Sequence, residues 1–186
     1  MWNIVAVILV LAIVAIGLLE VYQSYESGTN AQSGQDLVTE TSSTIANLQT
    51  VYGQTPNLSS FTGATPYAVG ALPSDWTGTN SPYTIASGGS VAFTAIQITE
   101  NGAAPTQNNG YQMVFSGLSV GQCAALANFS VPEMYSAQVN GGVQDTNPAY
   151  NGAGNQTSGS GSSWPPVLAA SCTNGATNTI TYEIVG

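Results

Sequence analysis

Residues 2–19 form an almost wholly apolar stretch, in which Asn3 and Gly17 are the exceptions. As a helix, this stretch would be about 27 Å long, close to the hydrocarbon thickness of a bilayer. It lacks the polar stripe that a helix on the surface of a globular core presents to water. The sequence therefore predicts a membrane-spanning segment, or a helix surrounded by equally apolar partners.

The flanks of this stretch bear on how it is processed. A secretory signal peptide has a basic first region and a small-residue cleavage site, and neither is present. Membrane helices normally take their orientation from flanking Lys or Arg, yet none lies on either side. We expect that a basic leader is removed just before the segment. The alternative is that Met1 is the initiator residue and that insertion proceeds without this cue.

The composition excludes several classes of function. The 186 residues include no Lys, Arg or His, and the formal net charge is −9. Binding of nucleic acid through a basic patch is excluded, as are catalytic sites that need an imidazole base or a Schiff-base Lys. Two Cys cannot form a four-thiolate zinc site. Paired carboxylates remain formally able to hydrolyse glycosides, but they share no motif. We therefore expect a non-enzymatic protein without cofactor or metal.

The missing basic residues also suggest an environment. Below about pH 3 most carboxylates are protonated, so retained Lys or Arg would leave the surface strongly cationic. A chain without them stays near neutral in acid, and we hypothesise an acid-exposed surface, as in an acidophile. The alternative is a low-charge coat protein at ordinary pH, either sugar-coated or resistant to proteases.

A second, amphipathic helical segment is predicted after Glu20. Residues 27–34 contain two glycines and poor helix formers, so we expect a bend or local unwinding there. Gly53 and Pro56 are expected to end the helix. Its apolar face recurs at spacings of three and four and comprises Leu37, Thr41, Thr44 or Ile45, Leu48, and Val51 or Tyr52.

The rest of the chain predicts a small β-rich unit. Strands are expected over residues 83–86, 91–99, 111–116 and 179–185, with a fifth candidate over 133–139. A short helix is expected over residues 120–129, and a long surface loop over 141–163. Cys123 and Cys172 suggest one disulfide in an exported chain; two free buried thiols are the alternative. The candidate N-glycosylation sites are Asn57, Asn128 and Asn155; sugars linked to Ser or Thr in the long loop are the alternative.

Three stretches carry a resemblance to a known family: QDLVTETSSTIANLQTVY from residue 35, GLSVGQCAALA from residue 117 and CTNGATNTITY from residue 172. With the helix preceding a small sheet, they resemble type IV pilins, most closely the type IVb branch of thin-pilus and conjugative subunits. The resemblance implies an α+β fold. In it, a long N-terminal helix, apolar in its first half and amphipathic in its second, packs on a small antiparallel β-sheet head with a C-terminal disulfide loop.

The resemblance also implies a division of labour along the chain. Residues 1–26 would be the hydrophobic assembly or transmembrane helix, residues 27–53 its amphipathic half, and residues 54–186 the globular head with a disulfide-bounded region over 123–172. A prepilin peptidase would remove the leader, and the inner membrane would hold the subunit until the assembly machinery adds it to a helical homopolymer. The filament core would comprise Met1, Trp2, Ile4, Val5, Ile8, Leu9, Leu11, Ala12, Ala15, Ile16 and Leu19.

The sequence departs from the family pattern at one position. Most members carry Glu at position 5, thought to neutralise a neighbouring subunit's N-terminal amine, and this chain has Val5. Glu20, about 22 Å further along the helix axis, could take that role only with a large axial offset between subunits. Its alternative role is a solvated residue at the membrane edge.

The sequence thus predicts the major subunit of an extracellular pilus, with heads exposed for adhesion or surface attachment. The alternatives are a minor pilin or secretion pseudopilin, an archaeal pilin, and a membrane-anchored binding domain.

Overall fold

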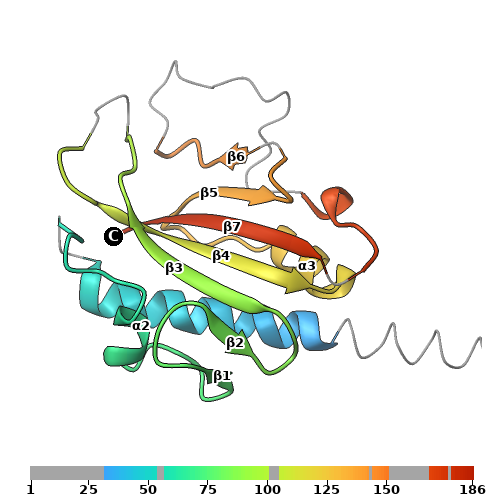
Figure 1. Cartoon of the computed structure of the whole chain (residues 1–186). Coiled ribbons are helices and arrows are strands. Elements are labelled where there is room, and N and C mark those ends of the chain that lie inside the picture. Colours follow the sequence, from blue (N-terminus) through green and yellow to red (C-terminus); the bar gives the residue numbers. More distant parts are fainter. Residues whose placement is uncertain (1–31, 54–56, 101–104, 143, 151–167, 176) are drawn as a thin grey trace, which may run out of the picture.

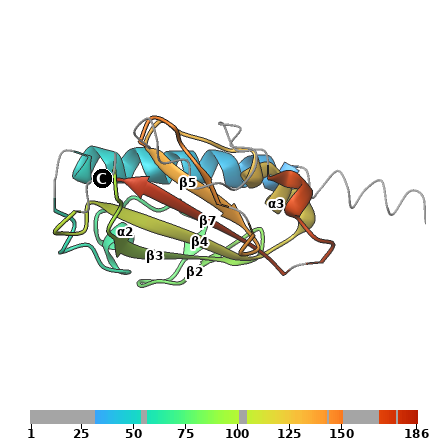
Figure 2. The ribbon, with the colours of Figure 1, turned by 90° about the horizontal axis from the view of Figure 1, so that it is seen from above.

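The computed structural model describes residues 32–53, 57–100, 105–142, 144–150, 168–175 and 177–186. Within them, a long helix over residues 32–52 lies across one face of a seven-stranded sheet (Figures 1 and 2). All strand pairs are antiparallel, and the order is β1-β2-β3-β4-β7-β5-β6. The strands are β1 (Trp76–Thr77), β2 (Tyr83–Ile85), β3 (Ser90–Ile96), β4 (Gly110–Leu118), β5 (Met134–Val139), β6 (Gln144–Thr146) and β7 (Asn178–Val185). Three short helical elements complete the fold: α2 (Thr65–Ala68), α3 (Val120–Ala127) and the 3-10 turn η1 (Ala169–Ser171).

The core lies between the long helix and the inner face of the sheet. Along β7 buried and half-buried residues alternate, as expected for a strand with one face on a core. Ile180, Tyr182 and Ile184 are fully buried, and β4 adds Tyr111 and Met113 from the neighbouring strand. These findings confirm the α+β architecture expected from the sequence.

The long helix buries the apolar face predicted from its periodicity, and of the two candidates at the end of that face the structure selects Tyr52 over Val51. Both Thr44 and Ile45 are buried; at the end of the face, Val51 is 48% exposed, while Tyr52 packs edge-on against Phe61. Leu37, Thr41 and Leu48 are fully buried. The helix ends before Gly53 as predicted, whereas Pro56 lies outside the described residues.

Gly34 marks a close crossing between the long helix and α3. A Cβ atom at this position would lie 2.9 Å from both the Ala125 Cβ and the Gly121 carbonyl oxygen. A bend or local unwinding was predicted over residues 27–34. Residues 32–34 are helical instead, and residues 27–31 lie outside the described residues. In the described part, this glycine allows close packing.

The five predicted strands and the helix over 120–129 are confirmed as β2, β3, β4, β5, β7 and α3. β3 ends at Ile96, three residues earlier than predicted, because the backbone beyond it bonds to the Asn109 side chain instead of to a neighbouring strand. The Asn109 amide accepts a hydrogen bond from the Ile98 N–H at 2.7 Å and donates one to the Ile98 carbonyl at 3.0 Å.

The loop prediction for residues 141–163 is wrong over its first part. Gln144–Thr146 forms β6 and pairs with β5, and both Asp145 and Asn147 are buried. Polar side chains stabilise this edge: the Asn147 amide donates to the Met134 carbonyl at 3.1 Å. Hydrophobic periodicity could not have found this strand, because it contains no apolar residue. β1, α2 and η1 are too short to leave a periodic signal.

Candidate assembly surface, disulfide region and carboxylate sites

The predicted assembly residues precede the described part of the chain. The filament-core positions from Met1 to Leu19, and Glu20, lie outside the described residues. In the part that the structure describes, no helix has both the length and the apolar character needed to cross a membrane.

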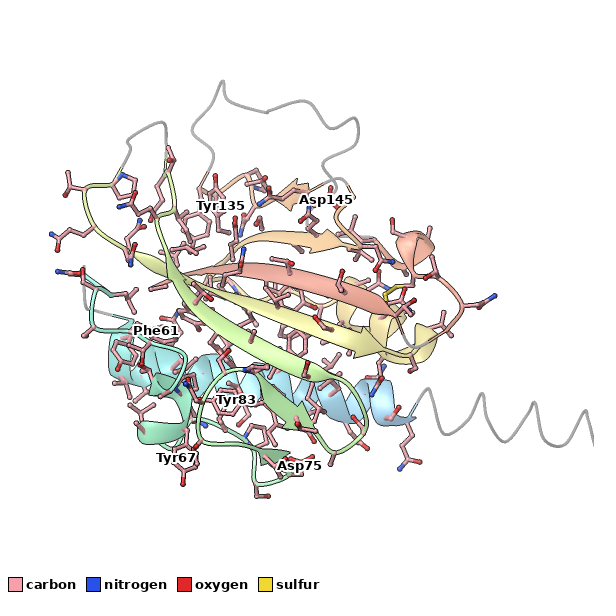
Figure 3. All side chains as sticks on the ribbon, in the orientation of Figure 1. Phe61, Tyr67, Asp75, Tyr83, Tyr135 and Asp145 are labelled. Atoms are coloured by element: carbon pink, nitrogen blue, oxygen red, sulfur yellow. A yellow bond between two sulfur atoms is a disulfide. The ribbon has the colours of Figure 1, made fainter. Side chains whose placement is uncertain are left out.

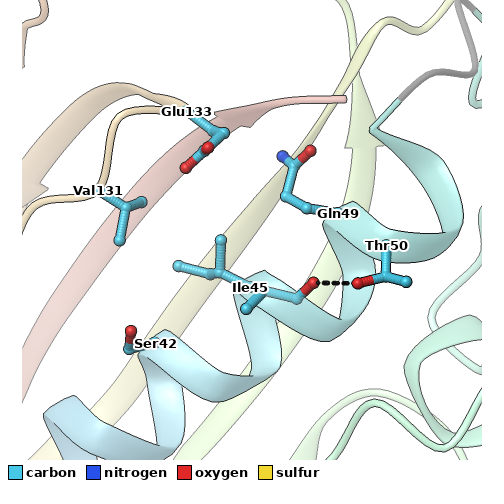
Figure 4. Close-up of a pocket in the computed structure, with 7 residues that line it drawn as sticks. Ser42, Ile45, Gln49, Thr50, Val131 and Glu133 are labelled. Atoms are coloured by element: carbon cyan, nitrogen blue, oxygen red, sulfur yellow. Dashed lines mark hydrogen bonds between the residues drawn. The ribbon is translucent and has the colours of Figure 1, made fainter.

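An open groove of about 400 Å³ runs beside the long helix (Figure 4). Gln49, on its helix side, donates through Nε2 to the Val185 carbonyl at 2.6 Å, and the Val185 N–H donates to the Glu133 carbonyl at 2.9 Å. The groove thus borders the point where the helix, the end of β7 and the segment before β5 join. Its lining residues are Ser42, Ile45, Ala46, Gln49, Thr50, Val131 and Glu133.

The predicted disulfide is present. Cys123 of α3 is bonded to Cys172, with their Cα atoms 5.9 Å apart and 49 positions apart in the sequence. Cys123 is fully buried and belongs to the hydrophobic core, while Cys172 is half-buried and follows η1. The bond therefore ties the segment that leads into β7 to a helix anchored in the core.

Two asparagines secure the same segment, and the sequence analysis did not single them out. Asn178 is fully buried; its Nδ2 atom lies within hydrogen-bonding distance of the Leu118, Thr173 and Gly175 carbonyls, and its Oδ1 accepts from the Thr173 N–H at 2.7 Å. Asn140, with a positive φ of 52°, donates from Nδ2 to the Ser171 carbonyl at 2.8 Å. The sequence offers little to single these two residues out, because Asn is common in and beside turns.

Two carboxylates of the described residues, those of Glu183 and Glu100, accept hydrogen bonds from neutral donors. The Ser136 hydroxyl and the Gln144 amide donate to Glu183 Oε2 at 2.7 and 2.8 Å, and the Asn109 amide donates to Glu100 Oε1 at 3.2 Å. These donors keep their protons at any pH in the ordinary range. The bonds therefore need no basic partner, in keeping with a chain that has no basic side chain.

Glu40 is a third carboxylate with a neutral donor. The buried Trp76 indole N–H donates to Glu40 Oε2 at 2.8 Å, across the contact between the long helix and β1. Burial raises the pKa of Glu40 above its ordinary value of 4.5, and the acidic groups of Asp75 and Asp36 raise it further. The Trp76 N–H acts in the opposite direction.

Two of the three candidate glycosylation sites lie in the described part of the chain. Asn57 is half-buried, and its Oδ1 accepts from the Ser59 N–H at 2.8 Å. Asn128 caps the C-terminus of α3 and is exposed. Asn155 lies outside the described residues, so Asn128 is the more accessible of the two sites seen.

Among the described residues, no three His, Cys, Asp or Glu side chains gather closely enough to hold a metal ion. Burial raises the pKa of the Tyr111 phenol, and the charge of Glu133 raises it further. The Tyr111 hydroxyl has no hydrogen-bond partner among the described residues.

The fold defines a class: an α+β domain with a long helix on a seven-stranded antiparallel sheet and a disulfide near the last strand. It is similar to the crystal structure of a type IV b pilin from Salmonella typhi, with 16% sequence identity and a TM-score of 0.44. That alignment covers 88% of this chain and 99% of the other. No protein-family model matches the sequence, and the comparison with curated proteins found no match.

Proposed function

We propose that this chain is the major subunit of a type IV pilus, most like the type IVb branch, with a structural, non-enzymatic role. One relationship carries the proposal. The amphipathic helix over residues 32–52 packs one face against the sheet, and the sequence before it contains an almost wholly apolar stretch of 18 positions, 2–19. A segment of this kind needs apolar partners, because exposing its surface to water is unfavourable.

Copies of the same segment are the partners we assign. Residues 1–26 would serve first as an inner-membrane anchor and then as the filament core, residues 27–53 as the bridge to the head, and residues 54–186 as the outer surface. Packing between apolar helices is driven by van der Waals contact rather than by charge. A prepilin peptidase and the assembly machinery would act before polymerisation, and the filament would lie at the cell surface.

Electron microscopy of material sheared from cells tests the proposal, with mass spectrometry to identify the subunit. A major pilin is the dominant protein of the sheared fibres; a minor pilin or secretion pseudopilin would be a trace component. Leu11→Asn should abolish fibres and leave the chain in the membrane fraction. Val51→Asn, at an exposed position of the helix over residues 32–52, is the matched control and should leave fibre yield unchanged.

A membrane-anchored binding domain would give a different result. That protein stays monomeric in membranes and does not appear in sheared fibres, whichever variant is expressed. An archaeal pilin is disfavoured by the amphipathic segment over residues 32–52, because in that class the apolar helix is expected to lead straight into the head.

Acid exposure forms the second part of the proposal. It is supported by the absence of basic side chains and by carboxylates that accept hydrogen bonds from neutral donors. Fibres that are weaker at pH 2 than at pH 7 would contradict it.

Glu20 is assigned to the membrane edge; loss of fibres in Glu20→Gln would instead indicate pairing with a neighbour's amine. Glycosylation is proposed at Asn128, and an intact mass equal to the bare chain would exclude it.

A further inference from the structure

Asn-Gly pairs are chemically reactive, and this chain has several of them. Because Gly has no side chain, its nitrogen can reach the amide carbon, Cγ, of the Asn before it. A bond forms between that nitrogen and Cγ, and the amide nitrogen leaves as ammonia. Water then opens the resulting succinimide ring to Asp or to isoaspartate, in which the main chain runs through the former side chain. The five pairs begin at Asn101, Asn109, Asn140, Asn151 and Asn174.

The fold decides which pairs can react, because the Asn side chain must turn toward the next nitrogen before the ring can close. A hydrogen bond that holds the amide elsewhere opposes this rotation. Asn109, Asn140 and Asn174 lie in the described part of the chain, whereas Asn101 and Asn151 lie outside it.

The Asn109 side chain is held in place. Its Oδ1 accepts from the Ile98 N–H at 2.7 Å, and its Nδ2 donates to the Ile98 carbonyl at 3.0 Å. Nδ2 also lies 3.2 Å from Glu100 Oε1. The two bonds to Ile98 fix the orientation of the amide, so its carbon is kept from the Gly110 nitrogen.

Asn140 shows that exposure alone does not make a pair reactive. The residue is exposed, yet its Nδ2 donates to the Ser171 carbonyl at 2.8 Å and to Asn178 Oδ1 at 3.0 Å. Its Oδ1 accepts from the Thr179 N–H at 2.8 Å. Ring closure at this position first requires the loss of these hydrogen bonds.

Asn174 is the open case. It is exposed and lies in a bend between Cys172 and β7, shortly after the disulfide that Figure 3 draws as a yellow bond. Within the described part of the chain, no hydrogen bond holds its side chain. The amide can therefore turn toward the Gly175 nitrogen while the head stays folded.

We propose that Asn174 is a site of spontaneous deamidation in the folded protein, and that the fold protects Asn109 and Asn140 from the same reaction. The reactants are the Asn174 amide, the Gly175 nitrogen and water, so no enzyme or cofactor is needed. Each conversion adds one carboxylate to a chain whose formal net charge is already −9. The inference concerns the folded head and does not rest on polymerisation.

The reaction has a structural consequence for the segment before β7. Asn178 Nδ2 lies 2.9 Å from the Thr173 carbonyl and 3.2 Å from the Gly175 carbonyl, one on each side of Asn174. Isoaspartate lengthens the main chain between these two carbonyls by one carbon atom. Asn178 then loses one of the two bonds, and the segment is held less firmly.

Ageing of the full chain in a nonionic detergent near neutral pH tests the proposal. Pepsin in acid provides the peptides, because the chain offers trypsin no Lys or Arg. Mass spectrometry then measures the small mass gain from amide to acid at each Asn. We expect Asn174 to convert at least about tenfold faster than Asn109 and Asn140, because each of those residues must first lose hydrogen bonds of about 1 kcal/mol apiece.

A parallel sample unfolded in guanidinium chloride separates the fold from the local sequence. There the rates at the three positions should approach one another. Equal rates in the folded chain would overturn the proposal. A preference for Asn174 that persists in the unfolded chain would overturn it too, because the preference would then come from the neighbouring residues alone.

Asn174→Gln is the matched variant for the structural consequence. It keeps the amide but lengthens the side chain by one methylene group, so closure of the ring is far slower. After the same ageing, the Tm of the parent chain should fall by about 2–4 °C, as for the loss of one hydrogen bond in a chain of this size, and that of Asn174→Gln should not. An equal fall in both, or no fall in a converted parent chain, would contradict the loosening of the segment.

Discussion

Asn140 donates a hydrogen bond from Nδ2 to Oδ1 of Asn178 at 3.0 Å, and thereby links the turn after β5 to the start of β7. Asn140 also binds the backbone of Thr179 in both directions. Its N–H donates to the Thr179 carbonyl at 2.9 Å, and its side-chain Oδ1 accepts from the Thr179 N–H at 2.8 Å. The segment that carries Cys172 is held between these residues. It is therefore secured twice, by a covalent bond and by the side-chain amides of Asn140 and Asn178.

Replacement of Asn178 by Ala should be costly. The change leaves the Leu118 carbonyl and the Thr173 N–H without their side-chain partner inside the protein, and we expect a loss of about 3 kcal/mol in the free energy of unfolding. Denaturant titration measures this loss. Asn174→Ala, at an exposed position of the same segment, should change stability by less than about 0.5 kcal/mol. Similar losses in both variants would contradict the role assigned to Asn178.

Removal of the disulfide should destabilise the head without releasing the segment before β7. For a loop of this length the chain-entropy model predicts a loss of about 4 kcal/mol in Cys123→Ala/Cys172→Ala. Because the asparagine network remains, limited proteolysis under native conditions should not cut residues 171–175 faster than in the parent chain. Rapid cleavage there would show that the disulfide alone holds the segment.

Gly34→Ala should destabilise the head although alanine favours helices. The new methyl group would meet Ala125 and the Gly121 carbonyl at 2.9 Å and force the long helix and α3 apart. We expect a loss of about 1–3 kcal/mol in thermal or denaturant unfolding. Ser43→Ala, at an exposed position of the same helix, should be neutral or slightly stabilising. A gain in stability for Gly34→Ala would indicate that the two helices can separate without cost.

Alkaline pH should weaken the fold through Tyr182. Burial raises the pKa of its phenol, whose O–H donates to the Leu126 carbonyl at 2.5 Å. The folded state therefore holds the proton more tightly, so this stability is present below about pH 10 and is lost as pH rises further.

Tyr182→Phe should be about 1 kcal/mol less stable at pH 7, yet lose less stability than the parent chain between pH 9 and pH 11. Tyr67→Phe is the control, because Tyr67 is 53% exposed. An unchanged alkaline slope in Tyr182→Phe would place the sensitivity at other tyrosines such as Tyr111.

Periodicity predicted the parts of the fold that bury apolar side chains. The helix face from Leu37 to Leu48 and strands such as β7 repeat their apolar residues at the spacing of their structure, and each prediction holds. β6 escaped detection because its edge is stabilised by polar bonds, including those of Asn147. The hydrogen bond between Trp76 and Glu40 could not be predicted, because the two residues are 36 positions apart and meet only when the sheet forms.

Strand order has a consequence for biosynthesis. β7, the last of the described strands in sequence order, lies between β4 and β5, so it joins one half of the sheet to the other. Until residues 178–185 have emerged from the ribosome, the two halves have no shared strand and Tyr182 has not entered the core. The head can therefore acquire its final form only after residues 178–185 have been translated.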